Sequence, residues 1–195
     1  MGAVERVGVL GGTFDPVHVG HIVAAAETRS VLDLDRVLMM VAGDPWQKRG
    51  RVVASPADRL ALVEAAVADV DGVEASALEI ERGDPSVTAD TLEALARPDR
   101  ELFLILGTDA VANLPSWRRL DDTSALATIV MVERAGHSDA APPGEGWRFV
   151  RVTIPQLDVS STDIRDRVAT GRPIDGLVLP AVMRAIRARG LYTAG

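Results

Sequence analysis

The sequence predicts an α/β protein with a doubly wound, mainly parallel sheet, and two patterns support this prediction. Short apolar runs recur without alternating polar residues, which is typical of strands buried on both faces of a parallel sheet. Helical patterns separate several of these runs, as β-α-β connections require. At 195 residues the chain is long enough for one sizeable domain, which we expect to span residues 1–195. The predicted strands are 7–10, 36–41, 74–81, 101–106, 127–132 and 148–153.

Capping residues and apolar spacing predict the helices. Ser55, Pro56 and Asp58 have the pattern of a helix start, with an N-cap, a first-turn proline and an acid at the third position. This helix is interpreted as structural. Thr88 is a good N-cap for a helix that runs to residue 96. The remaining predicted helices are 20–32, a helix opened by residues 160–162 and ended by Gly171, and 180–189.

Composition narrows the classes of function. The net charge of −7 disfavours a general nucleic-acid binder or membrane-surface binder, which would need an excess of basic residues. The chain has no cysteine and begins without a hydrophobic signal region, so we expect a cytoplasmic protein. No apolar run approaches the roughly 20 residues that span a bilayer. The oligomeric state stays open, and a homo-oligomer is compatible with the sequence.

The stretch GGTFDPVHVGH, residues 11–21, lies between the first predicted strand and the helix 20–32. In an open α/β sheet, this places it at the carboxyl edge of the strands, where ligands bind and helix N–H groups point outward. Gly11 and Gly12 would let the backbone approach a phosphate closely, although the spacing matches neither common phosphate-loop pattern. We therefore expect an anionic ligand here.

His18 and His21 are three residues apart at the helix start, so both rings can lean toward one point. Two imidazoles there could donate hydrogen bonds to a phosphate whose charge grows during displacement. Two alternatives stay open. The pair could be half of a metal site, which would need carboxylates from elsewhere because there is no cysteine, or it could be purely structural.

Three other segments could contribute to a nucleotide site. The hydroxyls of residues 160–162, followed one turn later by Arg165, suit an anion, although such a run is also a common cap. Lys48 lies in a loop with three positive charges within four residues and could hold a polyphosphate, or it could simply be solvated. Gly107 and Asp109 follow a strand and suit a ribose, with a helix cap as the alternative reading of Asp109.

Residues 11–21 resemble the (T/H)-x-G-H signature of the nucleotidylyltransferase superfamily, in the long form of the bacterial nicotinate-mononucleotide adenylyltransferases. Residues 159–165 resemble the I-S-S-T-x-x-R signature of the same superfamily. The resemblance spans nearly the whole chain and implies a Rossmann-like nucleotidyltransferase fold. It implies catalytic roles for His18, His21, Lys48 and Arg165. It also implies an ATP site formed by Gly11, Gly12, Thr13, Phe14, Gly20, Gly107, Asp109, Ser161, Thr162 and Ile164.

For the acceptor, the resemblance implies that Thr88 helps to recognise the pyridine carboxylate, that Trp117 stacks on the nicotinate ring and that Arg134 binds the acceptor phosphate. From the residues alone, Trp117 could equally be a core tryptophan. The chain departs from the family pattern at Val87, where tyrosine is usual, and at Ala135, where proline is usual. The loop before Lys48 also lacks the family's histidine. His137 is interpreted as a surface residue.

The resemblance implies adenylyl transfer from ATP to nicotinate mononucleotide, which yields nicotinate adenine dinucleotide and pyrophosphate on the route to NAD. Mg²⁺ would arrive with ATP, and no metal site made of protein side chains is expected. The same chemistry on nicotinamide mononucleotide or phosphopantetheine is an alternative. A nucleotide-binding module that senses ATP without catalysis is a second alternative, from a different class of function.

Overall fold

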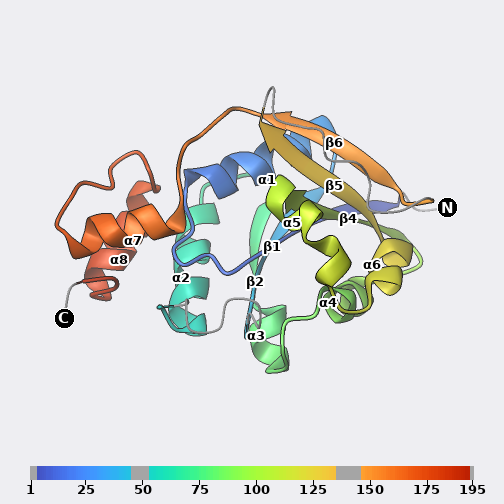
Figure 1. The fold of residues 1–195 in the computed structure, drawn as a ribbon, viewed down its shortest axis with the longest axis horizontal. Helices are drawn as coiled ribbons and strands as arrows, with labels where there is room; N and C mark the ends of the chain where they lie inside the picture. Colours follow the sequence, from blue (N-terminus) through green and yellow to red (C-terminus); the bar gives the residue numbers. More distant parts are fainter. Residues whose placement is uncertain (1–3, 45–52, 135–145, 194–195) are drawn as a thin grey trace.

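A six-stranded parallel sheet forms the centre of the computed structural model, which describes residues 4–44, 53–134 and 146–193 (Figure 1). The strand order is β3-β2-β1-β4-β5-β6, and every neighbouring pair is parallel. The predicted fold class is therefore confirmed. The strands are β1 (Glu5–Gly12), β2 (Arg36–Val41), β3 (Val73–Ser76), β4 (Arg100–Gly107), β5 (Ala127–Arg134) and β6 (Phe149–Ile154).

Helices cover both faces of this sheet, and alternate residues of each strand face opposite layers. In β4, Phe103 and Ile105 pack toward one face, whereas Leu102 and Leu104 pack toward the other. The first face is covered by α1 (Val19–Val31), α2 (Pro56–Val67), α7 (Ser161–Ala169) and α8 (Pro180–Ala188). The second face is covered by α4 (Thr88–Leu95), α5 (Thr108–Ala112), the 3₁₀ turn η2 (Leu114–Ser116) and α6 (Leu120–Leu126). Burial on both faces explains the continuous apolar strands.

The chain reverses its direction of travel across the sheet between β1 and β4. From β1 it runs outward through β2 to β3, then returns to place β4 on the opposite side of β1. Loops that leave two such strands turn to opposite faces, so a crevice opens at the carboxyl ends of β1 and β4. Residues 13–21 of the GGTFDPVHVGH stretch follow β1 at this point.

Most predicted elements agree with the structure to within about two residues, but three differences bear on the site. Only residues 73–76 of the predicted strand 74–81 form β3, and the helix α3 (Leu78–Arg82) follows and ends at Gly83, whose φ is +72°. The helical turn buries Glu79, which accepts a hydrogen bond from Thr91 at 2.7 Å. Gly11 and Gly12 belong to β1, because they pair with β2. Val87, not Thr88, occupies the N-cap position of α4, and no side-chain hydrogen bond caps this helix.

The start of α2 is confirmed in detail. The Ser55 hydroxyl accepts a hydrogen bond from the backbone N–H of Asp58 at 3.1 Å, and Pro56 is the first helical residue. No helix among the described residues is long and apolar enough to span a membrane.

Candidate active site

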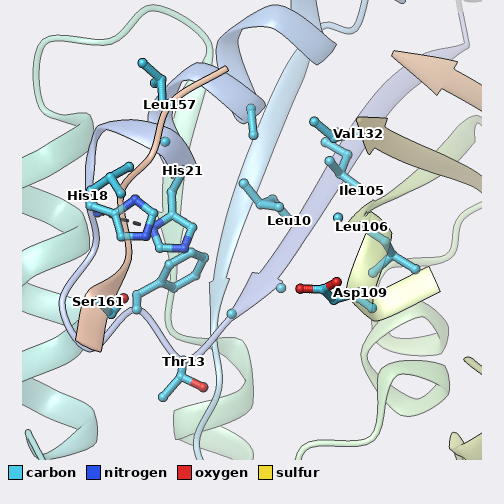
Figure 2. A pocket seen from close by; sticks show the side chains of 18 of the residues that line it. Leu10, Thr13, His18, His21, Ile105, Leu106, Asp109, Val132, Leu157 and Ser161 are labelled. Carbon is cyan, nitrogen blue, oxygen red and sulfur yellow. Dashed lines mark hydrogen bonds between the residues drawn. The ribbon is translucent and has the colours of Figure 1, made fainter. Parts of the chain in front are cut away.

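A cavity of about 1040 Å³ lies in the crevice between the ends of β1 and β4 (Figure 2). The first turns of α1 and α7 and the ends of β5 and β6 complete its walls. Most of the residues predicted for the ATP site and for catalysis line it, although they come from three distant parts of the chain. They are Gly11, Gly12, Thr13, Phe14, His18, Gly20, His21, Gly107, Asp109, Ser161, Thr162 and Arg165.

His18 and His21 stack on one another at the cavity wall. Their ring centroids are 3.7 Å apart and their planes are inclined by 23°. The Nδ1 atom of His21 accepts a hydrogen bond from the backbone N–H of His18 at 3.2 Å. That nitrogen therefore carries the lone pair, and the proton of a neutral His21 lies on Nε2. This hydrogen bond fixes the tautomer that can donate to a ligand.

Burial lowers the pKa of His18 from 6.5 to about 4. His18 is therefore neutral at neutral pH and can contribute an N–H donor, but no full charge. Its Nδ1 atom is buried and makes no hydrogen bond within the described part of the chain.

Two glycines of the motif are required by close packing around the histidines. A Cβ atom on Gly12 would lie 2.7 Å from the ring of Phe14, which in turn meets His21 edge to face at 5.0 Å. A Cβ atom on Gly20 would lie 3.2 Å from both the His18 ring and the Val159 side chain. A larger residue at either position would push against the Phe14 or His18 ring, so these glycines allow the aromatic rings to take their positions at the cavity wall.

The N-terminus of α7 meets the motif from the opposite side. The Ser160 hydroxyl caps this helix by accepting the N–H of Asp163 at 3.1 Å, which confirms the predicted helix start. Ser161 donates its hydroxyl to the carbonyl of Pro16 at 2.8 Å. Arg165 donates to the carbonyl of Asp15 at 2.7 Å, and its side chain is 21% exposed. This helix start therefore brings hydroxyl, guanidinium and backbone donors to the cavity.

A second cavity, of about 480 Å³, adjoins the first and shares the wall around Gly11, Gly12 and Asp109. Thr88 and Trp117, the predicted acceptor residues, line it together. Ser86 and Glu79 also line it. The hydroxyl oxygen of Ser86 and the indole Nε1 of Trp117 are buried and make no hydrogen bond within the described residues. Buried donors of this kind are suited to polar groups on a ligand.

Of the predicted site residues that the structure describes in full, Ile164 lines neither cavity. Ile164 is fully buried in the core beneath α7, so its side chain serves packing. Arg134 ends β5, and its side chain lies outside the described part of the structure, as do residues 48 and 137 in full. The predictions for Arg134, Lys48 and His137 therefore stay predictions. Among the residues described, no three His, Cys, Asp or Glu side chains form a group that could hold a metal ion.

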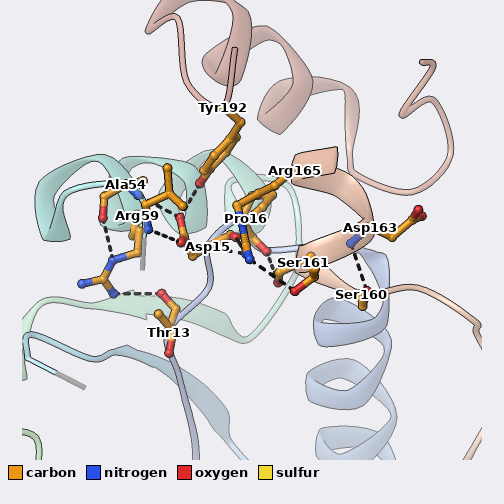
Figure 3. Close-up of polar contacts among 12 residues, drawn as sticks. Thr13, Asp15, Pro16, Ala54, Arg59, Ser160, Ser161, Asp163, Arg165 and Tyr192 are labelled. Atoms are coloured by element: carbon orange, nitrogen blue, oxygen red, sulfur yellow. Dashed lines mark hydrogen bonds and ion pairs between the residues drawn. The ribbon is translucent and has the colours of Figure 1, made fainter. Parts of the chain in front are cut away.

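Sequence analysis assigned no role to three buried residues whose side chains form hydrogen bonds in and around the loop of residues 13–16. Asp15, Arg59 and Tyr192 are 3%, 1% and 7% exposed and converge behind residues 13–16 (Figure 3). Asp15 lies within the recognised motif, and Arg59 lies on a helix interpreted as structural. Nothing in the sequence connects Tyr192 with a residue 177 positions earlier. The missed cavity-lining residues of the loop after β6 are Pro155, Leu157 and Val159.

The parallel sheet and the glycine–histidine loop at its switch point define a nucleotidyltransferase, and residues 9–167 match the cytidylyltransferase-like family model. A relative from Roseiflexus castenholzii, described as "Probable nicotinate-nucleotide adenylyltransferase", is 46% identical over 194 residues, which cover 96% of this chain and 98% of the relative. A Streptomyces coelicolor protein with the same description is 42% identical and covers 94% and 98%. The chain belongs to the nicotinate-nucleotide adenylyltransferase family.

A solved structure agrees in fold. The nicotinic acid mononucleotide adenylyltransferase of Plasmodium falciparum, complexed with NaAD, superposes with a TM-score of 0.79 over 96% of this chain and 97% of that chain. Its sequence identity is 16%, so the agreement concerns the fold alone.

Proposed function

We propose that the protein transfers the adenylyl group of ATP to nicotinate mononucleotide and releases pyrophosphate, as a step of NAD synthesis. One observation carries this proposal: the cavity lined by the stacked His18–His21 pair and Arg165 adjoins the cavity lined by Thr88 and Trp117, with Asp109 in the wall of both. Such an arrangement suits a reaction between two ligands that meet at one phosphate.

The proposed reaction needs no nucleophile from the protein. An oxygen of the acceptor phosphate attacks the α-phosphorus of ATP, and the bond from that phosphorus to the oxygen bridging to the β-phosphate breaks. Pyrophosphate leaves with the bonding electrons. Because the acceptor is already an anion, the protein contributes positioning and charge stabilisation.

His21 and Arg165 are the donors that we assign to the ATP phosphates. The Nε2–H of His21 would stabilise charge that develops during transfer, because its tautomer is already fixed by the backbone of His18. Arg165 would hold the departing pyrophosphate with the N–H groups that do not bind the loop. Lys48 is proposed to assist Arg165, on the sequence resemblance alone.

The second cavity is assigned to the pyridine nucleotide. Trp117 would stack on the pyridine ring, and Thr88 at the first turn of α4 would bind the ring's carboxylate. Arg134 is proposed to bind the acceptor phosphate. Asp109, in the shared wall, would accept hydrogen bonds from a ribose.

Mg²⁺ is proposed to enter bound to ATP, as part of the substrate. The phosphates would supply its ligands, together with water, which is the usual coordination of this ion beside nucleotides. A cytoplasmic location stays a prediction, and the oligomeric state stays open.

The test is a comparison of acceptors with ATP and Mg²⁺ held constant. Pyrophosphate release and dinucleotide formation are measured with nicotinate mononucleotide, nicotinamide mononucleotide and phosphopantetheine in separate reactions. We expect turnover with the nicotinate form to exceed turnover with the other two. Equal or faster turnover with either of the others would refute the assigned acceptor, and ATP binding without turnover of any acceptor would favour a nucleotide sensor.

A further inference from the structure

The Asp15 carboxylate is the centre of a buried hydrogen-bond network beneath the phosphate-binding motif (Figure 3). It accepts three hydrogen bonds: from the N–H of Val53 at 2.7 Å, from the N–H of Ala54 at 3.1 Å, and from the Tyr192 hydroxyl at 2.8 Å. Its main-chain carbonyl accepts a fourth, from Arg165. Asp15 therefore connects the loop of residues 13–16 with α7, with the residues before α2 and with Tyr192.

Arg59 supports the same loop from α2. Its guanidinium donates to the carbonyls of Thr13 and Ala42, each at 2.8 Å, and to those of Gly43 and Ala54, each at 3.3 Å. These carbonyls follow β1, follow β2 and precede α2. A rigid fork of five donors can bridge several acceptors at fixed angles, so Arg59 fixes the relative positions of the loops that leave β1 and β2.

Tyr192 completes the network from a segment that follows α8. Burial and the neighbouring Asp15 carboxylate raise the pKa of its hydroxyl, so the group stays protonated and acts as a donor. Tyr192 has a φ of +64°, a conformation that costs free energy for a residue other than glycine. Neither Tyr192 nor Arg59 is among the described residues that line the two cavities.

Three carbonyls of the 13–16 loop are held by side chains from distant parts of the chain. The carbonyl oxygens of Thr13, Asp15 and Pro16 accept hydrogen bonds from the side chains of Arg59, Arg165 and Ser161, respectively. A carbonyl free to rotate toward the cavity would repel an anion. Because hydrogen bonds hold these carbonyls in place, the loop does not need to rearrange when the phosphates of ATP bind.

We propose that Tyr192 and Arg59 are positioning residues for adenylyl transfer. Tyr192 acts through the Asp15 carboxylate on the 13–16 loop and on Arg165, which bonds the Asp15 carbonyl. Arg59 acts on the same loop directly, through the carbonyl of Thr13. Tyr192 thereby forms part of the catalytic apparatus, although it lines neither cavity. This inference rests on the proposed function in so far as its effect is measured by turnover.

The experiment removes the Tyr192 hydroxyl alone, with Tyr192→Phe, in the full-length chain. The matched control is Thr123→Val, which removes a fully buried hydroxyl that bonds a backbone carbonyl in α6, away from the phosphate cavity. We expect Tyr192→Phe to lower kcat by about 10- to 100-fold, the scale of a small misplacement of catalytic groups. The control is expected to lower Tm to a similar extent with kcat unchanged.

A double-mutant cycle separates positioning from general stability. In an Arg165→Ala background, Tyr192→Phe should change kcat by less than about threefold, because the group that it positions is missing. A second variant, Arg59→Lys, keeps the positive charge but loses the planar guanidinium with its several donors. It should lower kcat, while circular dichroism shows a folded protein. Equal effects of Tyr192→Phe with and without Arg165, or a lowered Tm with normal kcat, would overturn the inference.

Failure of the proposed function would be visible separately, as absence of dinucleotide formation by the unmodified protein. In that case the affinity for a non-hydrolysable ATP analogue, measured by calorimetry, decides the inference. Weaker binding by Tyr192→Phe than by Thr123→Val would support it, and equal binding would refute it.

Discussion

The proposed phosphate end, which is the cavity lined by His18, His21 and Arg165, differs from the proposed acceptor end, which is the cavity lined by Thr88 and Trp117, in how its backbone is held. At the phosphate end, the carbonyls of Thr13, Asp15 and Pro16 all accept hydrogen bonds from side chains of distant elements. At the acceptor end, Ser86 Oγ and Trp117 Nε1 are buried and make no hydrogen bond within the described residues. The loop of the phosphate end is thus preorganised by the protein. His18 Nδ1 is also buried there without a hydrogen bond among the described residues, so both ends keep hydrogen-bonding capacity for a ligand, but only the phosphate end has its loop carbonyls fixed by distant side chains.

The two ends also differ in what supports them. The loop of residues 13–16 is held by two charged residues, Asp15 and Arg59, which are almost inaccessible to solvent. The segment that follows Trp117 is tied to α4 by Arg119, an exposed residue that pairs with Asp90 and Glu93 as well as with Asp122. Exposed ion pairs contribute little each and are screened by salt, so we expect the acceptor end to be the more adaptable of the two.

The largest expected effect tests the preorganised end. His21→Ala removes the donor whose tautomer is fixed by the His18 backbone, and should cost about 3–4 kcal/mol of transition-state stabilisation, a fall in kcat of about 10²- to 10³-fold. Steady-state kinetics with saturating ATP would measure it. His21→Phe keeps an aromatic ring beside His18 and Phe14 but has no N–H, so it should be equally slow. A fast His21→Phe enzyme would show that the ring serves packing only.

A smaller effect is expected at the acceptor end. Trp117→Ala removes the proposed stacking surface and should weaken acceptor binding by about 1–3 kcal/mol, with the KM for ATP nearly unchanged. Trp117→Phe keeps a π face and loses the indole N–H, so the difference between the two variants separates stacking from hydrogen bonding. Kinetics with each substrate varied in turn would measure the effect. A parallel rise in both KM values would contradict separate subsites.

The parts of the site that could be predicted from the sequence are those encoded over short distances. The apolar run of β2, the cap at Ser55 and the spacing of His18 and His21 are local patterns, and the structure contains all three as predicted. The predicted strand 74–81 includes Glu79. The structure places it in a helix, where its carboxylate reaches the Thr91 hydroxyl.

The supporting network could not be predicted because its members are brought together only by the complete fold. The hydrogen bond from Tyr192 to Asp15 joins residues 177 positions apart, and that from Arg165 joins residues 150 positions apart. Arg59 stands in an amphipathic helix, where an arginine is ordinarily exposed. It can be buried because four backbone carbonyls accept its hydrogen bonds. Every residue has such a carbonyl, so the sequence does not indicate which of them will surround Arg59.

The smallest expected effect concerns the charge of His18. Its pKa is about 4 in the folded protein and 6.5 when unfolded, so between these values only the unfolded state binds the proton. The contribution of His18 to the free energy of unfolding is therefore complete above about pH 6.5 and is lost as the pH falls toward 4. We expect a loss on the order of 1 kcal/mol, since the ring is partly exposed to the cavity.

His18→Gln isolates this contribution, because glutamine is polar but does not titrate in this range. Urea unfolding of both proteins across the interval should show wild-type stability falling more steeply with acid than that of the variant. An NMR titration of the His18 ring supplies the direct measurement. A midpoint near 6.5 in the folded protein would mean that the ring is open to water, and the neutral His18 assigned to the preorganised end would then be wrong.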